Sequence, residues 1–345
     1  MHTVYFNRGF SAYSFMISSL KAKWIRSSLK VVITHGSKDP YLMEVADHFE
    51  VEPQCSGEAY LDYILEVCTR HKVDVFFPRK HVSSLAQHRA RFEERGIKVA
   101  FVGSAEHYAL FDHKLNACLD LQRRGLTLIP QVELVHDYSA FQAAYERIRA
   151  TSLDPERDQR ETVCLKPNEG IGGKGFMRIS HRRTELEDLF RESVHSISYT
   201  RLDRALREAD PFPELLLSTY LSGDEISVDC IGDRGDLLAA YPRVYLSKHE
   251  QRFEDHPDLI EACREICRAY ELSHLFNVQF KRHHGAWYFI ELNTRSAAGA
   301  HRITALGVCP LSVSLALCLG EQPTRDLSIS WGASVRRVER YERSE

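Results

Sequence analysis

The chain has 345 residues, of which 43% are hydrophobic and 27% charged, and its formal net charge is −3. This composition is typical of a globular protein with large hydrophobic cores, and the length predicts two or three domains. The small negative charge gives no general affinity for polyanions, so we expect no nucleic-acid partner. The longest apolar run, residues 311–319, is too short to span a bilayer, and Asn7 and Arg8 stand where a signal peptide would be apolar. We therefore expect no membrane association.

Nine cysteines are scattered along the chain, many of them inside apolar runs. This distribution predicts reduced, mostly buried thiols and a cytoplasmic protein. Cys263 and Cys267 lie four residues apart on an expected helix, but no second Cys or His pair at metal-ligand spacing accompanies them. The sequence therefore predicts no zinc site.

The first hundred residues alternate between strand-like and helical patterns. Strand-like runs occupy residues 3–6, 30–34, 73–78 and 98–103, and helical spacing occupies residues 11–21, 41–49, 60–71 and 82–94. Strands that alternate with helices predict right-handed crossovers and a parallel sheet. The polar loops at residues 7–11 and 35–39 would lie at the ligand side of such a sheet, although ordinary connections have the same composition.

The next hundred residues are mixed. Residues 106–124 have the pattern of one helix that carries Asp112 and Lys114, and a strand (residues 126–135) and a helix (residues 138–149) are expected after it. Residues 154–161 contain no apolar anchor except a proline and predict an exposed loop. A charged amphipathic helix is expected near residues 184–194. The charge-dense residues 199–210 are interpreted as a mobile surface segment.

A glycine-rich stretch at residues 162–180, TVCLKPNEGIGGKGFMRIS, is the most distinctive part of the chain. Its glycines, which free the backbone so that N–H groups can converge on an anion, are Gly170, Gly172, Gly173 and Gly175. They satisfy G-x-G-x-x-G, but a strand-like run follows where a dinucleotide-binding motif needs a helix. A Walker-type loop would need a glycine at position 168 and a Ser or Thr at position 175. The stretch instead predicts a glycine-rich hairpin flap beside Lys166, although such hairpins are often plain turns.

From residue 215 onward the pattern favours antiparallel strands and ends in a polar hairpin. Strands are expected at residues 215–221, 225–231 and 237–246, a helix at 257–270, and a hairpin from strands 276–282 and 287–293. Alternation places Glu291 and Asn293 on one face with Phe289, and Gln279 on the partner strand could reach the same face. With Arg295 in the following loop, these oxygen ligands predict a cradle for Mg²⁺ and phosphate. An edge hairpin with a polar face remains the simpler alternative.

These features occur in one known order. Lys114, then LKP and the glycine flap, then YLSGDE, FNVQF and FIELNTRSAAG together resemble the ATP-grasp superfamily of carboxylate ligases, most strongly over about residues 106–320. The alternating N-terminal part is similar to the α/β domain that precedes ATP-grasp in the branch with carbamoyl-phosphate synthases and biotin carboxylases. The opening YFNRGFSAYS and the length also resemble an ATP-grasp branch encoded near tellurium-resistance operons.

The resemblance implies an α/β protein with an ATP-grasp fold preceded by a small parallel, Rossmann-like α/β domain (a pre-ATP-grasp domain). The implied boundaries are 1–105 for the N-terminal domain, 106–330 for the ATP-grasp domain with a mobile lid at about 126–214, and 331–345 for a C-terminal tail. Two departures stand out. Ser218 replaces the glutamate that is common at the hinge, and Thr294 replaces the usual proline. Neither removes a charge from the metal cradle, so we expect catalytic competence.

The resemblance also implies roles for individual residues. Lys114 and Lys166 would hold the ATP phosphates beneath the flap glycines, and Arg295 would lie beside the reacting phosphoryl group together with Lys166. The remaining implied residues form the nucleotide and metal sites: the hinge Thr219, Tyr220 and Leu221 for adenine, Glu225 for the ribose hydroxyls, and Gln279, Glu291 and Asn293 for magnesium, with Gln279 also beside the nucleotide. Substrate contacts would come from variable loops that the motifs do not reach, with Arg243 and His301 as candidates.

The implied activity is ATP-dependent ligation. ATP with Mg²⁺, or Mn²⁺ as an alternative, would convert a carboxylate into an acyl phosphate, and an amine or thiol would then attack it with release of ADP and phosphate. The flap would exclude water from the intermediate. The implied partners are a small carboxylic acid and an amine, amino acids or a peptide among them, and a homodimer is compatible with the sequence. Two alternatives share the motifs: a carboxylate kinase that releases the acyl phosphate, and a catalytically inactive nucleotide-binding module.

Overall fold

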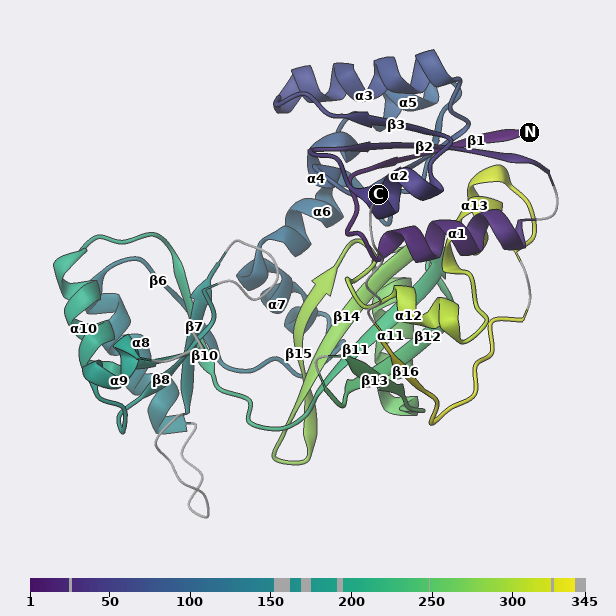
Figure 1. The fold of residues 1–345 in the computed structure, drawn as a ribbon. Helices are drawn as coiled ribbons and strands as arrows, with labels where there is room; N and C mark the ends of the chain where they lie inside the picture. The colour runs from purple at the N-terminus through teal and green to yellow at the C-terminus, as the bar shows by residue number, and fades with distance from the viewer. Residues whose placement is uncertain are drawn as a thin grey trace. The chain divides into compact units, whose positions relative to one another are not determined.

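The computed structural model describes residues 1–24, 27–151, 162–168, 175–190, 195–247, 249–323 and 326–338. The chain divides into two compact units. The first unit comprises Met1–Ala109, Ile226–Gln279 and Leu292–Glu345, and the second comprises Leu110–Glu225 and Phe280–Glu291. Both units are mixed α/β structures (Figure 1).

The first unit begins with a five-stranded parallel sheet in the order β3-β2-β1-β4-β5. Its strands are β1 (His2–Asn7), β2 (Leu29–His35), β3 (His48–Val51), β4 (Val75–Pro78) and β5 (Lys98–Val99). The helices between them are α1 (Tyr13–Lys23), α2 (Pro40–Val45), α3 (Gly57–His71), α4 (Val82–Ala86) and α5 (Arg89–Glu93). The predicted parallel sheet is therefore confirmed.

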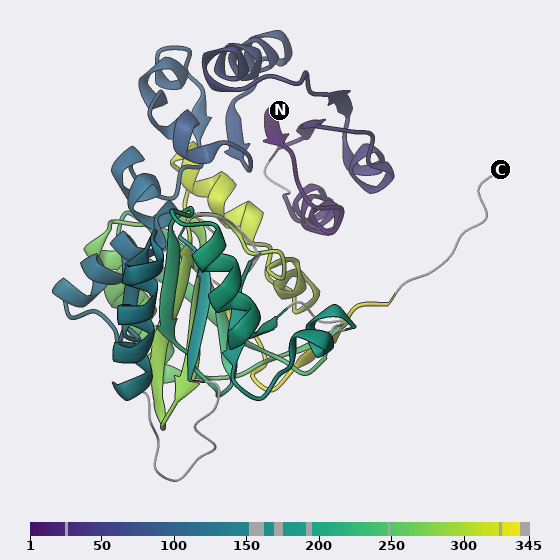
Figure 2. The same cartoon turned by 90° about the vertical axis from the view of Figure 1, so that its left-hand side faces the viewer.

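Helices cover both faces of this sheet, which explains why its strands are apolar on both sides. Val4 and Phe6 of β1 pack with Met16, Ile17 and Leu20 of α1 in one core. Helices α3 and α5 lie on the opposite face (Figures 1 and 2). There the Tyr5 ring stacks on Phe76, with ring centroids 4.8 Å apart. Helices α12 (His301–Ala305) and α13 (Pro310–Leu319) join the α1 core, so the end of the chain returns to the N-terminal sheet.

One helix expected in this region is wrong at its end. The helix predicted at residues 41–49 stops at Val45, and His48 begins strand β3. Asp39 caps the helix by accepting a hydrogen bond from the Leu42 amide at 3.1 Å, and Pro40 occupies its first position. The four-residue strand is too short for the alternation of its side chains to be recognised.

A second sheet has six strands in the order β15-β14-β11-β12-β13-β16. These are β11 (Glu225–Asp233), β12 (Asp236–Tyr245), β13 (Glu250–Phe253), β14 (His274–His283), β15 (Ala286–Asn293) and β16 (Ser334–Arg336), with helix α11 (Pro257–Ala269) between β13 and β14. The predicted hairpin of β14 and β15 is confirmed. Its two turn residues, His284 and Gly285, have φ of 47° and 81°, the signs that a type I′ turn requires.

The second unit contains a five-stranded sheet in the order β6-β10-β7-β8-β9. Its strands are β6 (Val132–Val135), β7 (Val163–Pro167), β8 (Met177–Ser180), β9 (Ser196–Ser198) and β10 (Leu215–Thr219). Helix α9 (Glu185–Leu189) lies between β8 and β9 in the chain, while α8 (Tyr138–Thr151) and α10 (Tyr199–Glu208) pack on the sheet through Phe141, Ile148 and Leu202. The antiparallel pairing of β7 with β8 confirms the strands predicted on either side of the glycines.

Two further expectations are corrected in this part of the chain. The single helix predicted at residues 106–124 is two helices, α6 (Ala105–Asp112) and α7 (Lys114–Arg123), because His113 is extended and its Nδ1 caps the Asn116 amide at 3.4 Å. The segment predicted to be a mobile surface at 199–210 is helix α10, with Leu202 and Leu206 buried. Two apolar residues spaced four apart were enough to anchor it, although charged residues surround them.

Candidate functional site

Lys166 lies on β7, a central strand of the second unit's sheet. It is half-buried and pairs with Leu216 of β10, two residues from the pair formed by Cys164 and Ser218. Burial raises the pKa of Cys164, while the Ser218 hydroxyl and the charges of Lys166 and Lys281 oppose that rise. The charge of Lys166 likewise opposes the burial-raised pKa of Cys118 on α7.

Lys114 reaches the end of β7 from the helix side. It is the first residue of α7, and its Nζ donates to the backbone oxygen of Asn168 at 3.3 Å. The Asn168 side chain, 1% exposed, hydrogen-bonds to His113 Nε2 (2.9 Å), the Glu214 carboxylate (3.0 Å) and the Leu115 amide (3.3 Å). Asn168 thus fastens the end of β7 to the N-terminus of α7 and fixes the spacing of the two predicted phosphate lysines.

The predicted adenine hinge follows β10. The Thr219 and Tyr220 amides are already used, donating to Gln131 O (3.0 Å) and Thr162 O (2.7 Å). Within the described part of the chain, the Leu221 amide has no such partner. The Leu221 N–H is therefore the hinge donor that remains available to a base.

Cations flank the hinge tyrosine. The Arg178 guanidinium lies 5.3 Å from the centroid of the Tyr220 ring and the Lys281 ammonium lies 5.6 Å from it. Both distances permit cation–π attraction, which would hold the ring and both cations in place. Together with Lys166, these side chains form a basic cluster that the sequence reasoning found only in part.

Two glycines near the hinge and the flap have no room for a side chain. A Cβ on Gly223 would collide with the backbone oxygen of Arg282, which accepts a hydrogen bond from the Gly223 amide at 2.9 Å. Gly175 has a φ of 78°, and a Cβ there would lie 2.8 Å from the Pro167 ring. Gly170, Gly172 and Gly173 lie outside the described residues, so their predicted role stays a prediction.

The predicted metal-side residues lie at the end of the β14–β15 hairpin. Glu291 and Asn293 are half-exposed on β15 and alternate with the buried Leu292 and Thr294, as a strand at a site edge requires. Gln279 is half-exposed on β14, and Glu225, at the start of β11, is also accessible. The carboxylate of Glu291 and the amide oxygens of Asn293 and Gln279 are a donor set that suits Mg²⁺. Phe289, expected on the same face as Glu291, is 1% exposed and belongs to the core.

A buried polar network supports this hairpin from within the first unit. Arg243 of β12 is 1% exposed and its Nε donates to Asp229 of β11 at 2.5 Å. Asn277, two residues before Gln279, donates to the same carboxylate (2.9 Å) and to Ser227 (3.0 Å). Arg243 is therefore an internal residue of the sheet and lies on a strand, not in a loop as expected; its contact with substrate stays a prediction. His301 is half-buried, with its Nδ1 2.9 Å from Ala298 O.

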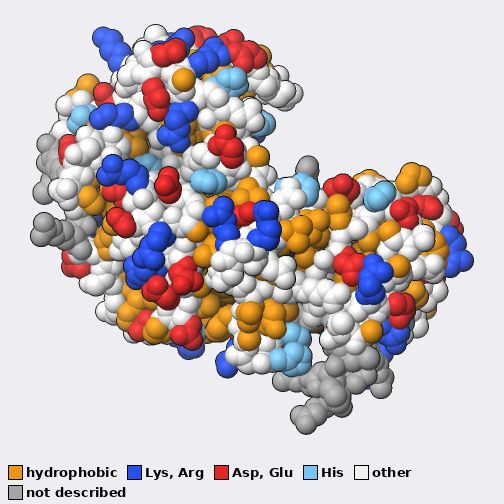
Figure 3. Space-filling model, turned by 180° about the vertical axis from the view of Figure 1, so that it is seen from behind, with side chains coloured by type: hydrophobic (Ala, Val, Ile, Leu, Met, Phe, Trp, Pro, Cys, Tyr) orange, Lys and Arg blue, Asp and Glu red, His pale blue; other side chains and the backbone are white. Residues whose placement is uncertain are grey.

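Among the described residues, one group of His, Cys, Asp and Glu side chains could hold a metal: His48, Glu50 and His71. Tyr63 and Arg70 already donate to the Glu50 carboxylate, at 2.9 Å and 2.8 Å. The Arg70 charge would repel a cation, so this group does not take the place of the predicted magnesium site. On the face seen in Figure 3, Lys and Arg side chains are interspersed with Asp and Glu, in keeping with the small net charge.

A parallel α/β domain, a lysine-bearing antiparallel sheet with a hinge, and a hairpin ending in Glu291 and Asn293 are the parts that the resemblance to the ATP-grasp class implies. The comparisons agree. Residues 211–341 match the family described as ATP-grasp in the biosynthetic pathway with Ter operon, and residues 16–100 match the PylC-like N-terminal domain. The chain therefore contains an ATP-grasp domain preceded by a PylC-like domain, and the predicted fold and resemblance are confirmed.

Known relatives extend the likeness. The carbamoyl phosphate synthase large chain of Clostridium perfringens is 22% identical over 238 residues, 60% of this chain and 20% of that protein. The chain thus spans about a fifth of the length of the curated relatives it matches. It contains, among the described residues, no helix long and apolar enough to cross a membrane.

Three solved structures share the fold. An ADP complex of N5-carboxyaminoimidazole ribonucleotide synthetase has a TM-score of 0.68 at 14% identity, covering 95% of this chain and 79% of that one. The biotin carboxylase domain of Hydrogenobacter thermophilus 2-oxoglutarate carboxylase, with MgADP and bicarbonate, has a TM-score of 0.67 at 16% identity, covering 96% of this chain and 73% of that one. The L-amino acid ligase of Bacillus licheniformis has a TM-score of 0.66 at 12% identity, covering 97% of this chain and 78% of that one. These likenesses show that the chain shares the fold of the three proteins.

Proposed function

We propose that the protein is an ATP-dependent carboxylate–amine ligase, with a thiol as the alternative nucleophile. The observation that carries the proposal is that the hinge and Lys166 lie on one pair of strands, with Lys114 of α7 beside the end of β7. From Val163, opposite Thr219, to Lys166, opposite Leu216, β7 advances by three residues, about 10 Å. A nucleotide whose base binds at the hinge would therefore extend its phosphates to Lys166 and Lys114.

In this arrangement each nucleotide contact has a candidate residue. The Leu221 N–H would donate to the adenine ring, the Thr219 carbonyl would accept from its amino group, and Glu225 would accept from the ribose hydroxyls. Lys166 and Lys114 would neutralise the phosphates as point charges. The flap glycines 170–175 would supply backbone N–H groups and cover the phosphates from water.

The metal-side residues complete the proposed site. Gln279, Glu291 and Asn293 would hold Mg²⁺, or Mn²⁺ in its place, through oxygen atoms alone. Bound there with ATP, the metal would spread the charge that develops on the phosphates. Arg295 would lie beside the phosphoryl group in transfer and, with Lys166, stabilise its equatorial oxygens.

The reaction then follows from positioning. A carboxylate oxygen of the acid attacks the γ-phosphorus as the bond to ADP breaks, and the product is an acyl phosphate. The amine attacks the acyl carbon, inorganic phosphate leaves, and the amine loses a proton to solvent. Positioning and charge neutralisation account for most of the rate enhancement in such transfers.

We further propose the division into an N-terminal domain at 1–105, an ATP-grasp domain at 106–330 with a lid at about 126–214, and a tail at 331–345. Small acids and amines, amino acids or peptides among them, are the proposed substrates, and the name of the Bacillus licheniformis neighbour supports amino acids. A homodimer is proposed because the Hydrogenobacter thermophilus domain is described as a dimer. A cytoplasmic location remains a prediction from cysteine usage.

The test is ADP release with Mg²⁺ and pooled amino acids, dipeptides and small acids, comparing wild type with Glu291→Ala. We expect substrate-dependent ADP release that Glu291→Ala abolishes with an unchanged melting temperature, because Glu291 is half-exposed. Glu265→Ala, on the exposed side of α11, is the matched control. Full ADP release by Glu291→Ala would refute the metal assignment.

Product analysis separates the alternatives. An amide product establishes ligation, whereas acyl phosphate trapped by hydroxylamine without an amide would identify a carboxylate kinase. ATP binding without ADP formation against any pool would identify an inactive nucleotide-binding module.

A further inference from the structure

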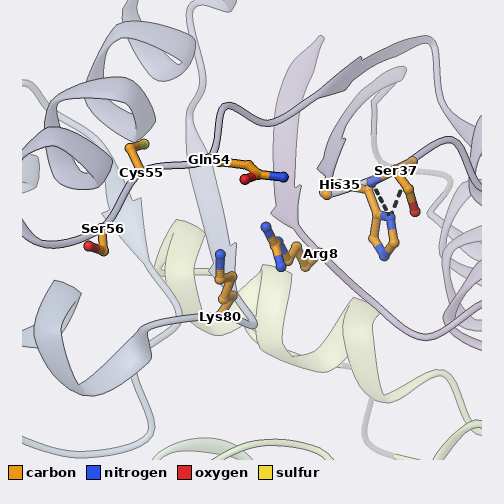
Figure 4. A pocket seen from close by; sticks show the side chains of 8 residues that line it. Arg8, His35, Ser37, Gln54, Cys55, Ser56 and Lys80 are labelled. Carbon is orange, nitrogen blue, oxygen red and sulfur yellow. Dashed lines mark hydrogen bonds between the residues drawn. The ribbon is translucent and has the colours of Figure 1, made fainter.

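The first unit contains a cavity at the carboxyl edge of its parallel sheet. Its volume is about 600 Å³, and the residues that line it include Arg8, His35, Ser37, Gln54 and Lys80 (Figure 4). Arg8 follows β1, His35 ends β2, Gln54 follows β3 and Lys80 follows β4. Four neighbouring strands thus end at one cavity, which is where open α/β sheets bind ligands.

Two cationic side chains meet in this cavity. Figure 4 shows the Arg8 guanidinium and the Lys80 ammonium close together, with the Gln54 amide directed toward them. Burial and then the nearby Arg8 charge lower the pKa of Lys80. Among the described residues, no carboxylate lies within ion-pair distance of Lys80. An anion between the two groups would relieve their repulsion.

A buried carboxylate holds Arg8 in place beneath the cavity. The Glu52 side chain is fully buried and accepts from Arg8 Nε (2.6 Å), Thr34 Oγ1 (2.8 Å) and Tyr60 OH (3.1 Å). This single carboxylate is paired with Arg8 and acts on Lys80 from a longer distance, so the two cations outnumber the one carboxylate. The cavity therefore suits one additional negative group.

The backbone around the cavity is held in unfavourable conformations. Arg8 has a φ of 51° and His81, next to Lys80, a φ of 54°, values that residues other than glycine rarely adopt. A Cβ on Gly36 would lie 2.9 Å from the Arg8 guanidinium carbon, so the guanidinium packs closely against the Gly36 backbone. The fully buried Asn7 side chain accepts from the Arg79 amide (2.6 Å) and donates to Lys80 O (3.1 Å). Strained backbone that the surroundings enforce is a feature of binding sites.

We propose that this cavity, here named the Arg8–Lys80 pocket, binds the oxyanion group of a small molecule, either a carboxylate or a phosphate. Resting on the proposed function, the bound molecule is one of the two substrates, held by an anionic group remote from its reacting atom. Arg79, adjacent to Lys80, donates to Ser296, which follows Arg295 by one residue. The pocket therefore shares a loop with a side chain that contacts the segment carrying Arg295.

The test uses the full-length protein and calorimetric titration with two probes, inorganic phosphate and glutarate. The variants are Lys80→Met, which removes the charge, Lys80→Arg, which keeps it, and Lys98→Met, an exposed lysine outside the pocket. Arg8 is left intact because its loss would leave Glu52 buried without a cation.

We expect wild type and Lys98→Met to bind one probe equally, Lys80→Met to bind it about ten- to a hundredfold more weakly, and Lys80→Arg to restore most of the affinity. Preference for phosphate or for glutarate identifies the oxyanion. Failure of both probes to bind wild type at millimolar concentration, or equal binding by Lys80→Met, overturns the proposal.

A parallel titration with a non-hydrolysable ATP analogue keeps the two proposals separate. Wild type and Lys80→Met should bind the analogue alike, since Lys80 is not among the proposed ATP contacts. If the analogue fails to bind wild type, the proposed function fails while the anion result stands. If it binds and neither probe does, the Arg8–Lys80 pocket is refuted alone.

Discussion

Asn168→Ala should weaken ATP binding through Lys114 without unfolding the protein. The variant removes three side-chain hydrogen bonds, to His113, Glu214 and the Leu115 amide. At about 1 kcal/mol net for each, the free energy of unfolding should fall by about 3 kcal/mol. Because a typical domain is stable by about 5–15 kcal/mol, the variant should remain folded. With the end of β7 released from α7, Lys114 should lose much of its contact with phosphate, and the Kd for ATP should rise about tenfold.

Urea unfolding and calorimetric ATP titration measure the two effects, with Asn116→Ala as the control because Asn116 is exposed on the same helix. Lys114→Met should weaken binding to a similar extent. If Asn168 acts by placing Lys114, the double variant should be little worse than Lys114→Met alone, since interacting residues are not additive. A Kd within twofold of wild type in Asn168→Ala, or full additivity in the double variant, would refute the positioning role.

The remaining predictions concern a charge, a glycine and a histidine. Lys166→Met should raise the Kd for ATP at least tenfold with little change in melting temperature. A lower melting temperature with unaltered ATP binding by the folded variant would make Lys166 a structural residue. Gly175→Ala should lower both stability and turnover. Gly96→Ala, with a similar φ of 70° but open space around it, should lower stability alone. Equal turnover in the two variants would show that the close contact between position 175 and Pro167 does not matter for turnover. Burial lowers the pKa of His274 to about 4, so the unfolded chain binds a proton between about pH 6.5 and 4 that the folded chain does not. As the pH is lowered through that window, the free energy of unfolding should fall by on the order of 2–3 kcal/mol. His274→Asn, which tolerates the φ of 59°, should reduce the slope of the free energy of unfolding against pH. An unchanged slope would contradict this prediction.

The sequence predicted those parts of the fold that local patterns determine. Alternating strands and helices predicted the parallel sheet, and the two strand-like runs on either side of residues 283–285 predicted the hairpin that carries Glu291. Patterns failed where a single local contact decided the structure. The apolar spacing of residues 106–124 fits one continuous helix, and only the cap formed by His113 divides it. That division makes Lys114 a first-turn residue, which no periodicity could show.

The site was predicted through its charged motif residues and missed through its supporting ones. Asn168 lies 46 to 55 residues from the groups it joins, and the Arg178–Tyr220–Lys281 contacts span three separate segments. Such contacts depend on the register of β7, β8 and β10, which a period-two pattern leaves open. Asn168 was visible in the sequence only as the residue that breaks a Walker motif.

Arg79, which follows β4 of the N-terminal sheet, contacts the segment that carries Arg295. The Arg79 backbone is fixed by Asn7, its guanidinium lies 4.3 Å from the centroid of the Tyr13 ring, and that guanidinium donates to Ser296. Tyr13, Arg79 and Ser296 line a small cavity together with Arg295, so the segment that would stabilise the transferring phosphoryl group lies against residues that follow β1 and β4 of the parallel sheet. Because Asn7 also binds the backbone of Lys80, a ligand in the Arg8–Lys80 pocket and the position of Arg295 depend on the same loop. Separating residues 106–330 from residues 1–105 would therefore remove the contacts that support Arg295, the proposed catalytic arginine, together with the proposed Arg8–Lys80 pocket.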